Sequence, residues 1–178
     1  GGTVIFSHGV TVSHLTSVKY MRLFYEEGYD CLVYDHRRHG GSGGEYTTYG
    51  YYEKYDLKAV VDWLEKTKGF HGKLGIHGES MGSAILLLYA GMEGSKADFY
   101  IADCPYTSVF EQMLYRMKVE YSRLLVPLLY LIDWIISVRA GFRLRDGNCL
   151  EAVRRVKQPI LFIHGDEDDY VPTEMGKA

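Results

Sequence analysis

The chain has 178 residues, of which 47% are hydrophobic and 24% are charged. This length supports one sizeable core and is short for two domains, so we expect a single domain over residues 1–178. A net charge of −3 at pH 7 excludes the concentrated positive field that nucleic-acid binding needs. Three cysteines, odd in number and widely spaced, predict neither a disulfide framework nor a zinc site, and favour a cytoplasmic location.

Short apolar runs alternate with longer segments of helical period. The runs that predict β-strands are Thr3–Ser7, Cys31–Tyr34, Leu74–His77, Phe99–Ala102 and Ile160–Ile163. Strands that alternate with helices are typical of a parallel sheet whose crossover connections are helical. We therefore expect an α/β fold with a mostly parallel sheet.

Helices are predicted at Lys19–Glu27, Tyr52–Lys68 and Ser80–Ala90. The first is expected to place three side chains on one face, namely Tyr20, Leu23 and Phe24. The second carries a single apolar stripe, as a helix on the surface of a sheet does. The third is apolar on most sides, which predicts deep burial.

Residues 107–148 contain no strand-like run and are rich in large apolar and aromatic side chains. An insertion of this length over a parallel sheet predicts a helical cap. Its strongest apolar stretch, Leu124–Val138, is interrupted by Pro127 and Asp133 and falls short of the roughly 20 residues of a bilayer-spanning helix. A shielded cap helix or a membrane-surface segment fits this stretch.

A G-x-S-x-G motif, formed by Gly78, Ser80 and Gly82, lies between an apolar strand and an apolar helix. In this context a serine occupies a sharp, strained turn, and glycines two residues on either side allow neighbouring elements to pass closely. We expect Ser80 to be a catalytic nucleophile. The alternative is a serine that caps a helix beside packing glycines.

Acyl transfer also needs hydrogen-bond donors for the oxyanion. The His8–Gly9 turn follows the first strand, and the helix after Ser80 begins with free amides. The backbone amides of Val10 and Met81 are our candidates for the oxyanion hole. An ordinary glycine turn is the alternative, and we interpret His8 as a residue that braces this loop.

The last predicted strand ends in a cluster of acids. A triad acid lies at the carboxyl end of a strand, where it orients a histidine ring. Asp168 is our candidate, but spacing alone leaves Asp166 and Asp169 open, and Asp103 at the end of the preceding strand is a rival. A solvated acidic turn would explain the same residues.

Four motifs together resemble the α/β-hydrolase superfamily, especially its bacterial esterases, lipases and serine aminopeptidase-like members. They are H-G, D-x-R-x-x-G-x-S, the serine motif and H-G-x-x-D-x-x-V-P, here at His8–Gly9, Asp35–Ser42, Gly78–Gly82 and His164–Pro172. The resemblance implies a three-layer α/β-hydrolase fold, a Ser-His-Asp mechanism and acyl substrates. It also favours Asp168 over the other acids.

The resemblance places the triad histidine downstream of the acid, but all seven histidines of this chain precede Asp168. The first motif corresponds to the third strand of the family. We therefore expect the chain to be truncated at both ends, to lack the triad histidine, and to be nearly inactive alone.

The function predicted is hydrolysis of a small-molecule carboxylic ester of an acyl or aromatic acid, with no metal or organic cofactor. Packed over Ser80, cap side chains would form a substrate tunnel, and our candidates are Tyr106, Phe110, Leu114 and Trp134. The alternative is that these side chains only pack against the sheet and line no tunnel.

Three other functions stay open: a peptidase, an acyltransferase and a non-catalytic ligand-binding protein. For the peptidase, Glu79 is the one hint of a pocket that binds a peptide amine. The basic residues of the cap indicate a solvated face or contact with an anionic membrane. The sequence predicts no oligomeric state.

Overall fold

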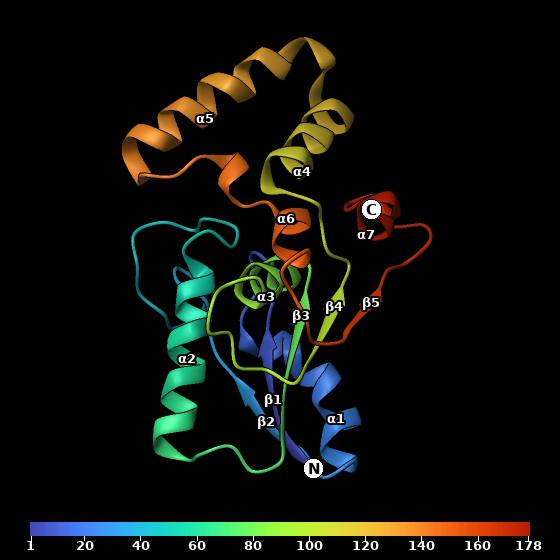
Figure 1. Ribbon diagram of the computed structural model, residues 1–178. Helices are drawn as coiled ribbons and strands as arrows, with labels where there is room; N and C mark the ends of the chain where they lie inside the picture. Colours follow the sequence, from blue (N-terminus) through green and yellow to red (C-terminus); the bar gives the residue numbers. More distant parts are fainter.

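A computed structural model describes residues 1–178, and its centre is a five-stranded parallel sheet. The strands follow the order β2-β1-β3-β4-β5 across the sheet (Figure 1). All four strand pairings are parallel, so all carboxyl ends meet at one edge. The strands are β1 Gly2–Ser7, β2 Asp30–Val33, β3 Lys73–Glu79, β4 Phe99–Asp103 and β5 Ile160–Ile163. Every predicted strand is present, with ends that differ by at most two residues.

Helices cover both faces of the sheet. On one face lies α1, Val18–Glu26, and on the other lie α2, Glu53–Thr67, and α3, Met81–Ala90 (Figure 1). All ten residues of α3 are buried, as its composition predicts. The expectation for α1 was wrong in part, because Leu23 is 66% exposed. Phe24 instead faces the sheet, with its ring centroid 5.5 Å from that of Phe6.

The predicted insertion, residues 107–148, contains helices and helical turns and no strand of the sheet. It holds α4, Val109–Arg116, a π-helical turn at Met117–Tyr121, and α5, Val126–Ala140. Short 3₁₀ turns at Arg123–Leu125 and Leu144–Asp146 complete it. These helices stand over the carboxyl edge of the sheet, at the end of the molecule opposite the N-terminus (Figure 1).

Three further short helices join these parts: the 3₁₀ helix His14–Ser17, α6, Cys149–Val153, and α7, Thr173–Lys177. Within the insertion, α5 is followed by Gly141, whose φ of 71° is the left-handed conformation common after a helix. No helix combines the length and the apolar character needed to cross a bilayer.

The last strand is exposed on its outer side in this chain. Leu161, Phe162 and Ile163 of β5 are 56%, 42% and 46% exposed. β5 is an edge strand and pairs with β4 alone. The apolar run Ile160–Ile163 thus forms the strand that the sequence predicts.

A buried carboxylate fixes the loop that leads into α2. Glu53 is fully buried and accepts hydrogen bonds from the Thr48 amide at 2.7 Å, the Thr48 hydroxyl at 2.5 Å and the Gly50 amide at 2.8 Å. A buried charge of this kind is tolerated because several donors satisfy it. Glu53 thereby holds the 46–50 loop against the carboxyl edge of the sheet.

Candidate active site

Ser80 forms the entire turn between β3 and α3. The strand ends at Glu79 and the helix begins at Met81, so one residue reverses the direction of the chain. Ser80 has φ 55° and ψ −114°, a conformation that costs energy for any residue with a side chain. Its amide donates to the Asp103 carbonyl at 2.9 Å, which ties the strained turn to β4.

Two glycines allow this turn to fit. A Cβ at Gly82 would overlap the carbonyl oxygen of Ser7, and a Cβ at Gly78 would overlap the carbonyl of Gly82. The motif therefore brings α3 against β1 at a separation that no larger residue permits. Both glycines are required by close backbone approach, since neither has a positive φ.

We predict that Gly82→Ala destabilises the protein by about 3 kcal/mol or more, because backbone atoms cannot move aside as a flexible side chain can. Urea unfolding followed by circular dichroism measures the change. Gly43→Ala is the control, since no atom lies within 4 Å of the added Cβ and Gly43 has no positive φ. Equal stability of the two variants would contradict this account.

The structure brings both oxyanion candidates to Ser80. Val10, Met81 and Ser80 line the same cavity. The Val10 amide donates to no protein acceptor, and Met81 is the first residue of α3, where an amide has no partner within the helix. A Cβ placed on Gly9 would lie 3.8 Å from the Ser80 Cβ, so the turn after β1 passes directly beside Ser80.

Neutral histidines hold the turn after β1. His8 is fully buried, and its Nδ1 donates to the Gly9 carbonyl at 2.7 Å while its Nε2 accepts from the His36 amide at 3.1 Å. Burial lowers the pKa of both His8 and His36, the latter well below its ordinary value. Both nitrogens of His8 are thus used in bracing, as the sequence indicated, and neither is available to take a proton from Ser80.

Asp35 fixes the segment behind these histidines. Its carboxylate accepts from the His14 amide at 2.8 Å, the His14 ring at 2.9 Å and the Gly41 amide at 2.9 Å. Burial acts to raise the pKa of Asp35, but these hydrogen bonds outweigh it and hold the pKa at about 2. The D-x-R-x-x-G-x-S motif is therefore structural, a brace for the loop that carries Val10.

Because the folded-state pKa of Asp35 is depressed from 3.8 to about 2, its carboxylate stabilises the fold above its unfolded-state pKa, and this contribution is lost as the pH falls towards 2. We expect Asp35→Asn to lower Tm at neutral pH, and the Tm difference to shrink across this acidic interval. Thermal unfolding at a series of pH values measures it. Asp30→Asn, at an exposed position, is the control, and a Tm difference that is constant over the interval would refute the role.

Asp168 is held in place by its own loop. Its Oδ1 accepts from the amides of Tyr170 at 3.0 Å and Val171 at 2.9 Å. Its Oδ2 lies 3.6 Å from Nε2 of His164, which donates to the Val171 carbonyl at 2.8 Å. Asp166 and Asp169 are exposed, whereas the Asp168 side chain is 23% exposed. Among the clustered acids, Asp168 is the one whose carboxylate the backbone orients.

The rival acid, Asp103, faces the other side of the sheet. Its Oδ2 accepts from the Tyr20 hydroxyl of α1 at 2.7 Å. The next residue, Cys104, has a positive φ of 45°, and burial raises the pKa of its thiol to about 12. A thiol with this pKa is protonated at neutral pH, so Cys104 is a poor candidate for a nucleophile.

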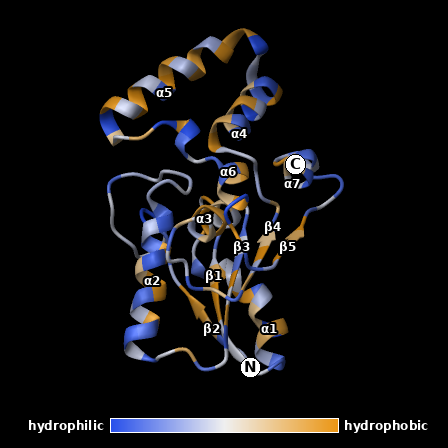
Figure 2. Cartoon of the chain, in the orientation of Figure 1, coloured by the Kyte–Doolittle hydropathy of each residue, from blue (hydrophilic) through white to orange (hydrophobic).

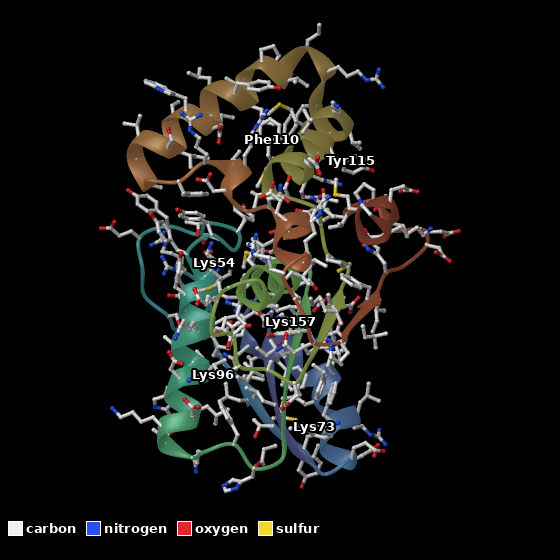
Figure 3. All side chains as sticks on the ribbon, in the orientation of Figure 1. Lys54, Lys73, Lys96, Phe110, Tyr115 and Lys157 are labelled. Carbon is white, nitrogen blue, oxygen red and sulfur yellow. The ribbon has the colours of Figure 1, made fainter.

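Helix α4 is hydrogen-bonded to the loop that carries Asp168, a contact that the sequence did not predict. Gln112 Nε2 donates to the Tyr170 carbonyl at 2.8 Å. The Tyr115 hydroxyl and Arg116 Nη1 both donate to the Asp169 carbonyl, at 3.1 and 3.2 Å. Figure 3 shows Tyr115 in the insertion, above the sheet. The sequence shows that these three polar residues have helical spacing. It does not identify their partners, which lie more than 50 residues away in the chain.

A cavity of about 500 Å³ opens at Ser80 between the sheet and the insertion. It is lined by 22 residues, of which 17 are hydrophobic, so it suits an apolar ligand. From the insertion come Val109, Gln112, Met113, Arg116, Met117, Glu120, Tyr121, Leu129, Ile132, Ile136, Ala140, Phe142 and Leu144. From the sheet side come Val10, Tyr46, Thr47, Tyr49, Ser80, Met81, Tyr106, Tyr170 and Val171.

Only one of the four predicted lining residues, Tyr106, borders this cavity. Phe110 instead packs against Tyr130, with ring centroids 5.6 Å apart (Figure 3). Leu114 lies outside the lining, and Trp134 is 58% exposed on α5. The helices of the insertion are apolar on more than one side, so composition alone did not indicate which side faces Ser80.

Two buried polar atoms interrupt the apolar wall. Gln112 Oε1 and Arg116 Nε have no hydrogen-bond partner, and both residues line the cavity. The one carboxylate in the lining, Glu120, is hydrogen-bonded to Arg116 Nη2. No histidine is hydrogen-bonded to Ser80, and no cluster of side chains has the composition of a metal site.

This combination of a strained Ser80, flanking glycines and two free amides agrees with the comparisons to known proteins. The sequence model of the X-Pro dipeptidyl-peptidase (S15) family matches residues 7–125, from the turn after β1 into the insertion. The chain belongs to this family of α/β hydrolases.

Relatives of this α/β hydrolase include the uncharacterized protein YqkD of Bacillus subtilis (strain 168), which is 49% identical over 171 residues. The match covers 96% of this chain and 56% of YqkD. The lysophosphatidylserine lipase ABHD12 of Macaca fascicularis is 24% identical, over 84% of this chain and 37% of that protein. The chain thus spans little more than half of YqkD and 37% of ABHD12.

Among solved structures, the esterase Pf2001 of Pyrococcus furiosus superposes with a TM-score of 0.75 and 30% identity, over 98% of this chain and 65% of that one. The α/β-hydrolase fold is therefore established for this chain.

Proposed function

We propose that this α/β hydrolase cleaves carboxylic esters of apolar acids through an acyl-enzyme on Ser80. The observation that carries the proposal is the position of Ser80 at the floor of a cavity in which 17 of 22 lining residues are hydrophobic. Such a cavity accepts an acyl chain or an aromatic ring and brings its carbonyl to the hydroxyl.

In the proposed reaction, Ser80 Oγ attacks the ester carbonyl carbon while a base takes the hydroxyl proton. The amides of Val10 and Met81 donate to the resulting oxyanion. The C–O bond of the ester then breaks, and the alcohol leaves with the proton returned by the base. Water attacks the acyl-enzyme in the same way and releases the acid.

The base in this proposal is a histidine outside the 178 residues, oriented by Asp168. All histidines near the site have other roles: His8 and His36 are buried and neutral, and His164 donates to Val171. The amides that hold Asp168 Oδ1 leave its Oδ2 for an imidazole N–H. The three cysteines are free thiols, which supports a reducing compartment such as the cytoplasm.

The second candidate is cleavage of peptides, the activity in the name of the matching family. A dipeptidyl peptidase must bind a free ammonium group. Glu120 is the one acid in the lining and is already bonded to Arg116. Glu79, the residue favoured for this role by sequence, is paired with Lys19 at 2.8 Å and does not line the cavity. These contacts favour an ester over a peptide as the substrate. Acyl transfer and ligand binding without catalysis remain as outcomes of the tests below.

We predict that Ser80→Ala lowers kcat/KM for p-nitrophenyl esters by at least about 10³-fold in the complete gene product, because the nucleophile is removed. A fluorophosphonate probe followed by peptide mapping is expected to label Ser80. The control is Ser95→Ala, whose hydroxyl bonds the Ala90 carbonyl far from the cavity. Undiminished turnover in Ser80→Ala would exclude the mechanism, and faster release of p-nitroaniline from an X-Pro substrate would favour the peptidase.

We expect Asp168→Asn to lower kcat by roughly 10²- to 10⁴-fold with little change in KM, since it impairs orientation of the base and not substrate binding. Asp166→Asn is a matched control in the same loop, because Asp166 is exposed. Steady-state kinetics on a short-chain ester measures both variants. Loss of activity in Asp166→Asn with retention in Asp168→Asn would assign the triad acid differently.

A further inference from the structure

Helix α5 carries apolar side chains on two opposite sides. On the inner side, four residues line the cavity above Ser80, namely Leu129, Ile132, Ile136 and Ala140. On the outer side, a second stripe is 44%, 49%, 41% and 67% exposed, formed by Leu128, Leu131, Ile135 and Val138. The inner stripe is explained by the cavity, but no part of the chain covers the outer one.

The outer stripe belongs to a larger apolar surface. Of the 23 large hydrophobic side chains that are exposed in the protein, ten lie within residues 119–138. Leu124 is the most exposed, at 87%, and Trp134 is 58% exposed. Figure 2 shows hydrophobic colour recurring along α5, at the end of the molecule remote from the N-terminus. Continuous apolar surfaces of this kind mark contact sites for a membrane or another protein.

The charge of the same region indicates which partner fits. The insertion has six basic and four acidic residues, a net charge of +2, whereas the whole chain has −3, so the remainder has −5. Five of the basic residues form no ion pair: Lys118, Arg123, Arg139, Arg143 and Arg145. Of the four acids, Glu120 is paired with Arg116, and Asp133 is buried and accepts from the Leu144 amide.

A symmetric contact with a second copy would bring these unpaired cations together, which is unfavourable. An anionic lipid surface complements them and also accepts the apolar side chains. α5 is too short to span a bilayer, so such contact leaves it at the surface, with its outer apolar side chains in the interface and the basic residues beside the lipid headgroups.

We propose that the outer face of α5, with its flanking basic residues, docks this α/β hydrolase onto the surface of an anionic phospholipid bilayer. The proposal concerns binding and does not depend on ester hydrolysis. Ester turnover of a soluble substrate in the absence of vesicles tests catalysis separately, so either idea can fail without the other.

Two tryptophans provide matched reporters, since Trp134 lies on α5 and Trp63 on α2, and they are 58% and 54% exposed. Emission of the complete gene product minus that of Trp134→Phe isolates Trp134, and Trp63→Phe isolates Trp63 in the same way. The vesicles are phosphatidylcholine with about one third phosphatidylglycerol, and some carry brominated acyl chains. We expect Trp134 emission to shift to the blue and to be quenched by bromine, and Trp63 emission to stay unchanged.

Two sets of variants test the surface itself. One is a triple variant that combines Leu128→Ser, Leu131→Ser and Ile135→Ser. It is expected to raise the lipid concentration for half-maximal quenching roughly tenfold or more. The control changes three exposed apolar residues outside the insertion, namely Leu15→Ser, Leu23→Ser and Tyr25→Ser. Arg123→Gln and Arg139→Gln are each expected to weaken binding about fivefold at low salt, without removing apolar surface.

The proposal is overturned if Trp134 emission is the same with and without vesicles, or if both triple variants weaken binding equally. It is also overturned if Trp134 shifts with protein concentration in the absence of lipid while analytical ultracentrifugation finds a dimer, since the occupant is then a second copy. Equal binding of the arginine variants and the parent at low salt would exclude the anionic lipid as partner.

Discussion

The strained turn at Ser80 is the constraint on which the site depends. A residue with φ 55° between a central strand and a buried helix persists only because its surroundings leave no alternative. Gly82 lets α3 approach the Ser7 carbonyl, and the Ser80 amide is fixed to the Asp103 carbonyl. The exposed hydroxyl and the free amide of Met81 are both products of that enforced geometry.

Around this turn, some polar groups hold neighbouring loops in place and others face the cavity. Asp35, His8 and His36 have all their strong interactions with neighbouring loops, and their pKa values are displaced so that one is charged and two are neutral. This division leaves the floor of the cavity with little free charge. In the proposed mechanism, the developing oxyanion would therefore meet oriented amides.

The sequence predicted the fold well because α/β architecture is encoded locally, by apolar runs and by glycines that permit one turn type. Ser80, Val10 and Met81 meet at the cavity for the same reason, since each follows a strand end. The substrate wall was predicted poorly. Trp134 and Tyr106 are both aromatic, and which of them faces Ser80 is decided by how the insertion docks, a tertiary contact that no local pattern encodes.

The three hydrogen bonds from α4 to the 168–171 loop have a consequence for how such proteins diversify. Gln112, Tyr115 and Arg116 make the insertion part of the support of the acid loop as well as the roof of the cavity. The insertion is therefore not an exchangeable module: a new roof grafted for a new substrate would loosen Asp168 unless it brought equivalent donors. Changes of specificity in this branch are expected to arise by substitution within the existing helices rather than by their replacement.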